Sequence, residues 1–226
     1  MTERECLQSC ALFEGLDDRA LHAALVFFAA RRASYRKGDA VIRIGGRLER
    51  FGLVLRGEVQ VLQDDIDGHH IIMAQNSAGE TFGESLCFLR IPEVPVYAFA
   101  VSNAQVLWLS CESLRKPCSD ALSFELFTRF TSMLARRTLN MNSRIQVLSR
   151  HSLREKILTF LSQCARKSGT RCVEIPFSRT DWAVYLGVNR SALTRELSRM
   201  RDEGLIAFEK RRFILCHPEA QADRPE

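Results

Sequence analysis

The sequence of 226 residues lacks the features of several common protein classes. No apolar run approaches the ~20 residues that a membrane-spanning helix needs, and the N-terminus lacks the basic-then-apolar layout of a signal peptide. None of the eight cysteines forms a Cys-x-x-Cys pair, which argues against a zinc ribbon or a thioredoxin-type site. We therefore expect a cytoplasmic protein without a membrane partner, in which cysteines are more often small buried residues or redox and metal ligands than disulfides.

Signatures of catalysis are missing as well. The sequence has no phosphate-cradling glycine loop, no nucleophile elbow and no evident pair of carboxylates. A metal-binding cupin would need a His-x-His pair on one face of a strand, whereas His69 and His70 are adjacent and point to opposite faces. We predict that the protein is not an enzyme, and its motifs define no metal site.

Positive charge is concentrated near the C-terminus. Residues 151–217 hold 13 Lys and Arg against 7 Asp and Glu, whereas residues 1–150 hold 18 against 17. A basic surplus confined to one region is typical of a surface that binds nucleic-acid phosphates.

Within this basic region the sequence has the pattern of a helix-turn-helix, in which the second helix can enter the DNA major groove. Ser178 can cap a first helix, and Gly187 stands where the tight turn needs a positive φ. The inward face of this first helix is formed by Trp182, Ala183 and Leu186. An ordinary helical hairpin is the alternative interpretation.

The second helix is expected to begin after Asn189, a good N-cap residue. Its inward face has the spacing i, i+4, i+7, formed by Leu193, Leu197 and Met200. The remaining positions of its first turns point outward, where arginine can bind guanine and hydroxyls can reach bases or phosphates.

A winged hairpin is predicted directly after this helix. Two short strand patterns, 205–208 and 213–216, flank a basic turn. The residues that we expect to contact DNA are Arg179, Asn189, Arg190, Ser191, Thr194, Arg195 and Arg199 from the helices and Lys210, Arg211 and Arg212 from the wing.

The N-terminal half has a different character. Residues 9–32 have a helical pattern that Ser9 or Asp17 could start, and residues 33–110 alternate short β-branched runs with turns such as Asp67-Gly68. Many short strands with regular turns predict an antiparallel sandwich or roll. The expected strands are 41–44, 51–56, 58–64, 70–74, 97–101 and 105–110.

A long helix is predicted over residues 120–150, with apolar residues at the period of a coiled coil. We expect a parallel dimer interface there, and the alternative is a helix packed on its own domain. The predicted interface consists of Phe127, Phe130, Leu134, Thr138, Met141, Ile145 and Leu148.

A capping box from Ser152 to Glu155 starts a fresh helix directly after the long one, which indicates a hinge. The expected fold class is α+β. The expected domains are an effector-sensing, jelly-roll-like β-roll (1–118), a dimerisation helix (119–150) and a winged helix-turn-helix domain (151–226).

This order of parts resembles the CRP/FNR family of bacterial transcription regulators. The motif from Gly38-Asp39 to Val61 is similar to the family's roll signature, and residues 82–86, Phe-Gly-Glu-Ser-Leu, are similar to the start of its ligand cassette. The resemblance implies a homodimer that binds a near-palindromic DNA site. It also allows RNA polymerase as a further partner. It also implies an effector pocket in the roll, and the residues that we expect there are Phe82, Gly83, Glu84, Leu86, Val94, Val96, Tyr97 and Met141.

The departures from the family pattern bear on the effector. Members that bind cyclic AMP carry Arg-Ser or Arg-Thr where this chain has Val94 and Pro95, and a buried phosphate without its arginine is very costly. We therefore expect an effector other than cyclic AMP. Iron–sulfur members use four cysteines, whereas this chain has only Cys6 and Cys10 near the N-terminus and Leu107 at the distant ligand position. An iron–sulfur cluster is therefore less expected than haem, and it would need Cys6, Cys10 and two of Cys87, Cys111 and Cys118.

Haem is a third type of effector in the family, and the candidate axial ligands here are Met73, His69, His70 and His151. A haem- or redox-dependent sensor of gases or nitrosative stress, a hydrophobic organic effector, and a thiol switch through Cys111 and Cys118 all remain open. A ligand-binding module without DNA binding is the rival from another class, and the basic C-terminal region argues against it.

Overall fold

The computed structural model describes residues 2–64, 70–175 and 177–216. The predicted Asp67-Gly68 turn and His69 lie outside the described residues. The chain forms two compact units, 1–135 and 136–226. Their division falls inside the predicted dimerisation helix, because the second half of that helix packs with the C-terminal elements. The sequence predicted three domains with boundaries near residues 118 and 150, whereas the packing of the chain gives two units that meet at residue 135.

The N-terminal unit begins with two short helices, α1 (Glu3–Ser9) and α2 (Asp18–Phe27). Thr2 and Glu5 form a capping box for α1, and Asp17 caps α2 by accepting a hydrogen bond from the Ala20 amide. The prediction of Asp17 as a helix start is confirmed, whereas Ser9 was wrongly predicted to start a helix. Ser9 is the last residue of α1, and its hydroxyl donates to the Cys6 carbonyl.

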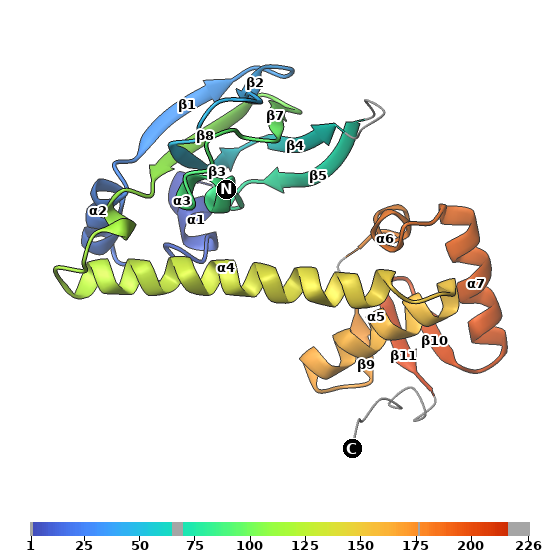
Figure 1. Ribbon diagram of the computed structural model, residues 1–226. Helices are drawn as coiled ribbons and strands as arrows, with labels where there is room; N and C mark the ends of the chain where they lie inside the picture. The colour runs from blue at the N-terminus through green and yellow to red at the C-terminus, as the bar shows by residue number, and fades with distance from the viewer. Residues whose placement is uncertain (1, 65–69, 176, 217–226) are drawn as a thin grey trace. The chain divides into compact units, whose positions relative to one another are not determined.

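Two four-stranded antiparallel sheets form the roll (Figure 1). One has the order β1-β8-β3-β6 and the other β2-β7-β4-β5. The predicted antiparallel roll is confirmed, although the sequence pattern missed β1 and β6. The strands are β1 (Arg31–Tyr35), β2 (Ala40–Ile42), β3 (Arg50–Arg56), β4 (Glu58–Asp64), β5 (His70–Ser77), β6 (Thr81–Phe82), β7 (Tyr97–Ala100) and β8 (Ala104–Ser110).

Strand β3 joins two hydrophobic cores because successive side chains point to opposite faces of its sheet. Phe51, Leu53 and Leu55 lie in the core between this sheet and the helices. Val54 lies in the core between the two sheets, together with Val106 of β8. The first sheet is therefore covered on both faces.

The interior of the roll is filled by the Phe82 ring. This ring packs edge-on against Trp108, with 5.6 Å between ring centroids, and lies directly over Gly52. A Cβ atom at Gly52 would come within 2.2 Å of the ring. Gly52 is thus required by close packing rather than by a turn.

The first half of helix α4 (Ala121–Leu148) packs on the face of the first sheet that points away from the second sheet (Figure 1). Phe130 was wrongly predicted as a dimer-interface residue. It is fully buried in its own unit, with its ring 5.7 Å from Phe51 and 5.3 Å from Phe88. The short helix α3 (Glu84–Phe88) supplies Phe88, and a 3₁₀ turn follows β8 at Ser113–Arg115.

The second unit contains the last turns of α4 and all later elements. Val147 of α4 is fully buried in this unit's core, and the Ser143 carbonyl accepts a hydrogen bond from Gln163 at 3.0 Å. The later elements are α5 (Leu153–Ser168), β9 (Cys172–Glu174), α6 (Arg179–Leu186), α7 (Arg190–Asp202), β10 (Ile206–Glu209) and β11 (Arg212–Leu215), with the sheet order β10-β11-β9.

The Ser152 capping box predicted for α5 is confirmed. In the described part of the chain, no helix combines the length and apolar character needed to cross a membrane.

The packing of Phe82 over Gly52 yields a stability prediction. Gly52→Ala should lower the free energy of unfolding by about 1–3 kcal/mol, because the added methyl group must displace the buried ring. Gly46→Ala is the matched control, since nothing lies within 4 Å of its added Cβ. Urea unfolding followed by circular dichroism would measure both, and equal stability of the two variants would contradict the predicted packing constraint.

Candidate nucleic-acid interface

The first helix of the predicted helix-turn-helix is α6, and Ser178 caps its N-terminus as predicted. The Ser178 side chain accepts a hydrogen bond from the Asp181 amide and also donates to the Asp181 carboxylate at 2.6 Å. Trp182, Ala183 and Leu186 are buried, and Trp182 is fully so. The inward face that the sequence pattern predicted is therefore confirmed.

The turn between the two helices depends on Gly187 and Asn189. Gly187 has φ +69°, a conformation that costs glycine little. The Asn189 side chain accepts a hydrogen bond from the Ala192 amide at 2.8 Å and so caps α7. These local interactions fix where α6 ends and where α7 begins.

Helix α7 presents a polar face to solvent. Leu193, Leu197 and Met200 are buried, as predicted. The opposite face exposes Arg190, Ser191, Thr194 and Arg195. Among the described residues, neither Arg190 nor Arg195 lies within ion-pair distance of a carboxylate, so both guanidinium groups are available to a ligand.

The hydroxyl groups on this face have local partners. Thr194 donates to the Arg190 carbonyl at 2.9 Å, and Ser191 donates to the Asn189 side chain at 2.8 Å. Arg199 is also exposed, but it lies 3.5 Å from Glu196 one turn earlier on α7. Arg199 therefore has a nearby carboxylate, which Arg190 and Arg195 lack among the described residues.

Arg154 of α5 holds α7 in place, a role that sequence reasoning missed. Its guanidinium binds Glu196 at 2.7 Å and Glu203 at 2.6 and 2.9 Å. These contacts lower the pKa of the Glu203 carboxyl, chiefly through the hydrogen bond from Arg154. Arg154 lies 42 and 49 positions before the two glutamates, so no local pattern could have indicated the contact.

Arg179 has a different environment from the one expected of a DNA contact. Its guanidinium lies over the rings of Phe208 and Phe213, at 5.1 and 4.8 Å, and donates to the Lys210 carbonyl at 3.0 Å. Burial lowers the pKa of this guanidinium. Arg179 therefore fastens the wing to the start of α6, in a cation–π arrangement.

The predicted wing is the hairpin of β10 and β11, in which Glu209 pairs with Arg212. The two residues between the strands are Lys210, with φ +50°, and Arg211. Both are exposed, as is Arg212. The hairpin tip thus adds three positive charges to the same unit that carries the face of α7.

Comparison with known protein families gives two matches, one within each unit. Residues 155–222 match the model of a Crp-like helix-turn-helix domain, and residues 32–120 match that of a cyclic nucleotide-binding domain. The chain belongs to the CRP/FNR family of transcription regulators.

Individual relatives are distant but cover most of the chain. It is 25% identical to the nitrogen fixation regulation protein FixK of Rhizobium meliloti, over 83% of this chain and 84% of that protein. It is also 25% identical to the transcriptional activator protein FnrL of Cereibacter sphaeroides, over 80% and 75%.

A solved structure supports the fold alone. The catabolite activator protein of Thermus thermophilus matches with a TM-score of 0.52 and 22% identity, over 91% of this chain and 93% of that one.

The residues that the CRP/FNR resemblance placed in an effector pocket divide into two groups. Phe82 and Val94 are buried in the core of the roll, with Leu86 and Val96 packed against it, while Gly83 caps α3 and Glu84 is buried beside it. The other group, Tyr97 and Met141, does not line the roll interior.

Tyr97 was wrongly predicted to line the effector pocket. Its neighbours Ala98 and Ala100 occupy the inner face of β7, so Tyr97 points to the outer face. There its hydroxyl donates to the Asp64 carboxylate at 2.5 Å, which raises the pKa of Tyr97 to about 12. His70 joins the same exposed cluster, 2.7 Å from Asp64.

The other effector candidates lie outside the roll core. Met141 is 65% exposed and belongs to the second unit. Met73 is 53% exposed on β5, and His151 is exposed in the second unit. These environments do not fit a buried haem with two of these residues as axial ligands.

The cysteines do not form a cluster site either. Cys6 is buried and donates to the Val54 carbonyl, and Cys87 and Cys111 contact each other. No group of three or more His, Cys, Asp or Glu side chains in the described ranges could hold a metal ion.

The Arg154 contacts predict a specific dependence of stability on pH. Glu203 has a lowered pKa in the folded protein, so its contribution is present above the unfolded pKa of about 4.3 and is lost as pH falls through the lower folded value. Arg154→Met should therefore destabilise the second unit near neutral pH and reduce the stability lost on acidification.

Urea unfolding at about pH 7 and about pH 3 would test this, with Trp182 fluorescence as the signal in a Trp108→Phe background. Arg166→Met, at the exposed end of the same helix, is the matched control. An equal loss of stability on acidification in the Arg154→Met variant and the wild type would contradict the assignment.

Proposed function

We propose that this protein is a sequence-specific regulator that binds double-stranded DNA as a homodimer on a near-palindromic site. The observation that supports this most is the exposed face of α7, where Arg190 and Arg195 have no carboxylate partner among the residues that the structure describes, while the opposite face is fully packed. The N-terminal turns of such a helix are the part that reaches base edges in the major groove.

The two arginines and the wing have different expected roles. An arginine on the first turns of α7 can donate two hydrogen bonds to guanine O6 and N7. Lys210, Arg211 and Arg212 lie on a hairpin tip, where their charges suit phosphates rather than bases. Base contacts then specify the sequence, and the wing supplies affinity that depends on salt.

Substitution on α7 tests this assignment. Arg195→Ala and Arg190→Ala should each weaken binding to the preferred site by about 1–3 kcal/mol and relax its specificity at one base pair. Arg211→Ala should weaken binding equally on all sequences and reduce the salt dependence. The measurement is fluorescence anisotropy on sites selected from random DNA, at several salt concentrations.

Arg166→Ala is the matched control, because it removes the same charge from an exposed position on α5. It should leave binding nearly unchanged. A uniform loss for all four variants would indicate a general charge effect without base reading. No binding to any DNA by the wild type would contradict the proposal itself.

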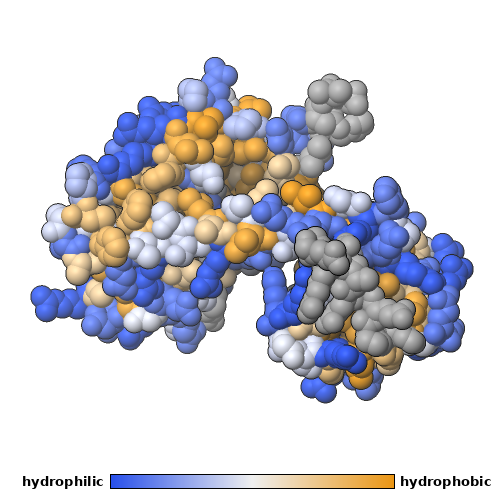
Figure 2. Space-filling model, turned by 60° about the horizontal axis from the view of Figure 1, so that its bottom comes forward, coloured by the Kyte–Doolittle hydropathy of each residue, from blue (hydrophilic) through white to orange (hydrophobic). Residues whose placement is uncertain are grey.

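A dimer interface on α4 is supported by a heptad-spaced stripe in which Phe124, Met141, Ile145 and Leu148 are exposed apolar residues. Positions Leu134 to Leu148 fit the a and d sites of a heptad repeat, and extending this register backwards includes Phe124, which is 62% exposed, and omits the buried Phe130. The full stripe is Phe124, Phe127, Thr131, Leu134, Thr138, Met141, Ile145 and Leu148. Figure 2 turns the α4 side of the molecule forward and shows apolar patches among polar side chains.

The interface predicts a difference between two neighbouring substitutions. Ile145→Glu places a charge in the stripe and should convert the dimer to a chain of 25.7 kDa, because an unpaired charge cannot be buried between helices. Leu139→Glu makes the same kind of change outside the heptad register, at a position that is 65% exposed against 57% for Ile145, and it should leave the dimer intact. Light scattering on the full chain gives both masses, and a dimeric Ile145→Glu variant would refute the interface.

For the effector, we propose a molecule other than cyclic AMP. Val94 stands where the phosphate-binding arginine of cyclic AMP-dependent members is expected, and it is 2% exposed within the roll core. Its backbone is held by hydrogen bonds to Gly45 and Gly46. An apolar side chain fixed at this position offers no charge to a buried phosphate.

A further inference from the structure

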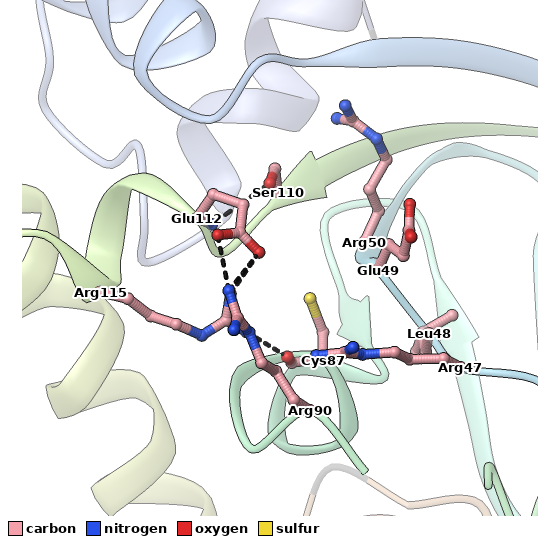
Figure 3. Close-up of a pocket in the computed structure, with 9 residues that line it drawn as sticks. All are labelled: Arg47, Leu48, Glu49, Arg50, Cys87, Arg90, Ser110, Glu112 and Arg115. Carbon is pink, nitrogen blue, oxygen red and sulfur yellow. Dashed lines mark hydrogen bonds and ion pairs between the residues drawn. The ribbon is translucent and has the colours of Figure 1, made fainter. Parts of the chain in front are cut away.

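A cavity of about 380 Å³ opens on the first unit, away from the core of the roll. It is bordered by the loop before β3, the end of α3 and the segment after β8 (Figure 3). Its lining is mostly charged, with arginines on each of these segments. The lining residues are Arg47, Leu48, Glu49, Arg50, Cys87, Arg90, Ser110, Glu112 and Arg115.

Three charged groups of this cavity bind one another. Glu112 accepts two hydrogen bonds from Arg90, at 2.8 and 3.0 Å, and one from Arg115 at 2.8 Å. Arg115 also donates to the Cys87 and Phe88 carbonyls at the end of α3. Arg115, whose side chain is 20% exposed, therefore links Glu112 to the backbone at the end of α3 next to Cys87.

The Cys87 sulfur points into the space between these side chains (Figure 3). Cys87 is almost completely buried by its neighbours, yet it lines a cavity many times larger than the roughly 30 Å³ that one water molecule occupies. The side chains that line the cavity cover the sulfur, so a local shift of these side chains, rather than unfolding of the unit, would bring a small molecule to it.

A second thiol lies in direct contact with the first. Cys111, which directly follows β8, is fully buried, and its side chain and backbone amide both hydrogen-bond to Cys87. This contact lowers the pKa of Cys87, with the charge of nearby Arg115 acting in the same direction, and it raises the pKa of Cys111. Cys87 also borders the cavity beside Arg115, whereas Cys111 is fully buried behind it, so Cys87 is the thiol that a small molecule meets first.

We propose that Cys87 and Cys111 form a modification site at which a small hydroperoxide, such as hydrogen peroxide, oxidises the two thiols to a disulfide. This proposal differs from the sequence hypothesis of a switch through Cys111 and Cys118, because Cys118 is exposed whereas the contact of Cys111 is with Cys87. It does not depend on the proposed DNA binding.

The reaction balances in two steps. The Cys87 thiolate attacks one peroxide oxygen, the O–O bond breaks, and the departing hydroxide takes up the proton lost by Cys87, which leaves a sulfenic acid and one water. The Cys111 sulfur then attacks the Cys87 sulfur, the S–O bond breaks, and hydroxide leaves with the Cys111 proton as a second water. Two electrons pass from the sulfurs to the peroxide.

The site lies where a new bond would affect a helix contact. Phe88 follows Cys87, and its ring lies 5.3 Å from Phe130 of α4 and under the Arg115 guanidinium. Shortening the sulfur–sulfur separation to the ~2 Å of a disulfide must move the end of α3 relative to β8. Such a shift would alter the Arg115 bonds to the Cys87 and Phe88 carbonyls and the contact between Phe88 and Phe130.

Peptide mapping of the oxidised full-length protein tests the proposal. Trypsin places Cys87 in peptide 57–90, Cys111 in 91–115 and Cys118 in 116–129, so each pairing gives a different cross-linked product. The reduced protein is treated with hydrogen peroxide, its remaining thiols are alkylated, and it is digested without reductant. We expect peptide 57–90 joined to 91–115, lighter than the two free peptides by two hydrogen atoms.

Three cysteine variants test which residues form the cross-link. Cys118→Ser should leave the cross-link unchanged, and Cys87→Ser should abolish it and leave Cys111 as a thiol. Cys111→Ser should accumulate a sulfenic acid on Cys87 that dimedone traps, because the second thiol is absent. Circular dichroism of each variant verifies that it is folded, and the wild-type map stands independently of the variants.

Other outcomes of the mapping would overturn the proposal. Cys87 and Cys111 both recovered as alkylated thiols would show that the cavity does not admit peroxide to a reactive sulfur. A cross-link between peptides 91–115 and 116–129 would assign the switch to Cys118 instead. Oxidation of Cys87 to a sulfinic acid in the wild type, without a cross-link, would show that Cys111 does not attack it.

Discussion

The candidate interface depends on how α7 is held against the rest of its unit. Arginines on a helix can read base edges only if the helix has one orientation, and α7 is fixed in two ways. Leu193, Leu197 and Met200 are fully packed on one side, and on another side Arg154 binds Glu196 within α7 and Glu203 directly after its end. An apolar contact alone would permit sliding, whereas two charge-assisted hydrogen-bonded pairs define a register. The exposed face of α7 is a consequence of these constraints.

Features set by neighbouring residues could be predicted from the sequence, because their causes lie within one turn of chain. The caps at Ser152, Ser178 and Asn189 and the turn at Gly187 are of this kind, and each has the predicted role. Roles set by distant contacts could not be predicted. Arg179 was expected on DNA, yet its charge lies over aromatic rings from the wing, and nothing near it in sequence indicates those rings.

Helix α4 shows why periodicity alone misplaced Phe130. A helix that must cover a core on one side and offer an interface on another has two apolar stripes, and a single spacing rule merges them. Burial separates the stripes, because Phe130 and Met133 are buried in the core while Phe124, Met141 and Ile145 stay exposed. The register that then emerges is more regular than the predicted one, since every step is three or four residues in strict alternation.

The filled interior of the roll limits where a small molecule can bind or react in the first unit. Phe82 occupies the interior over Gly52, so a ligand bound there must displace a buried aromatic ring from Trp108. The cavity around Cys87 needs no such displacement, because it is already open and polar. Both places adjoin α3, which Gly83 and the Arg115 contacts hold at its two ends. A change at either place reaches α4 through the same element, since the Phe88 ring at the end of α3 packs on Phe130.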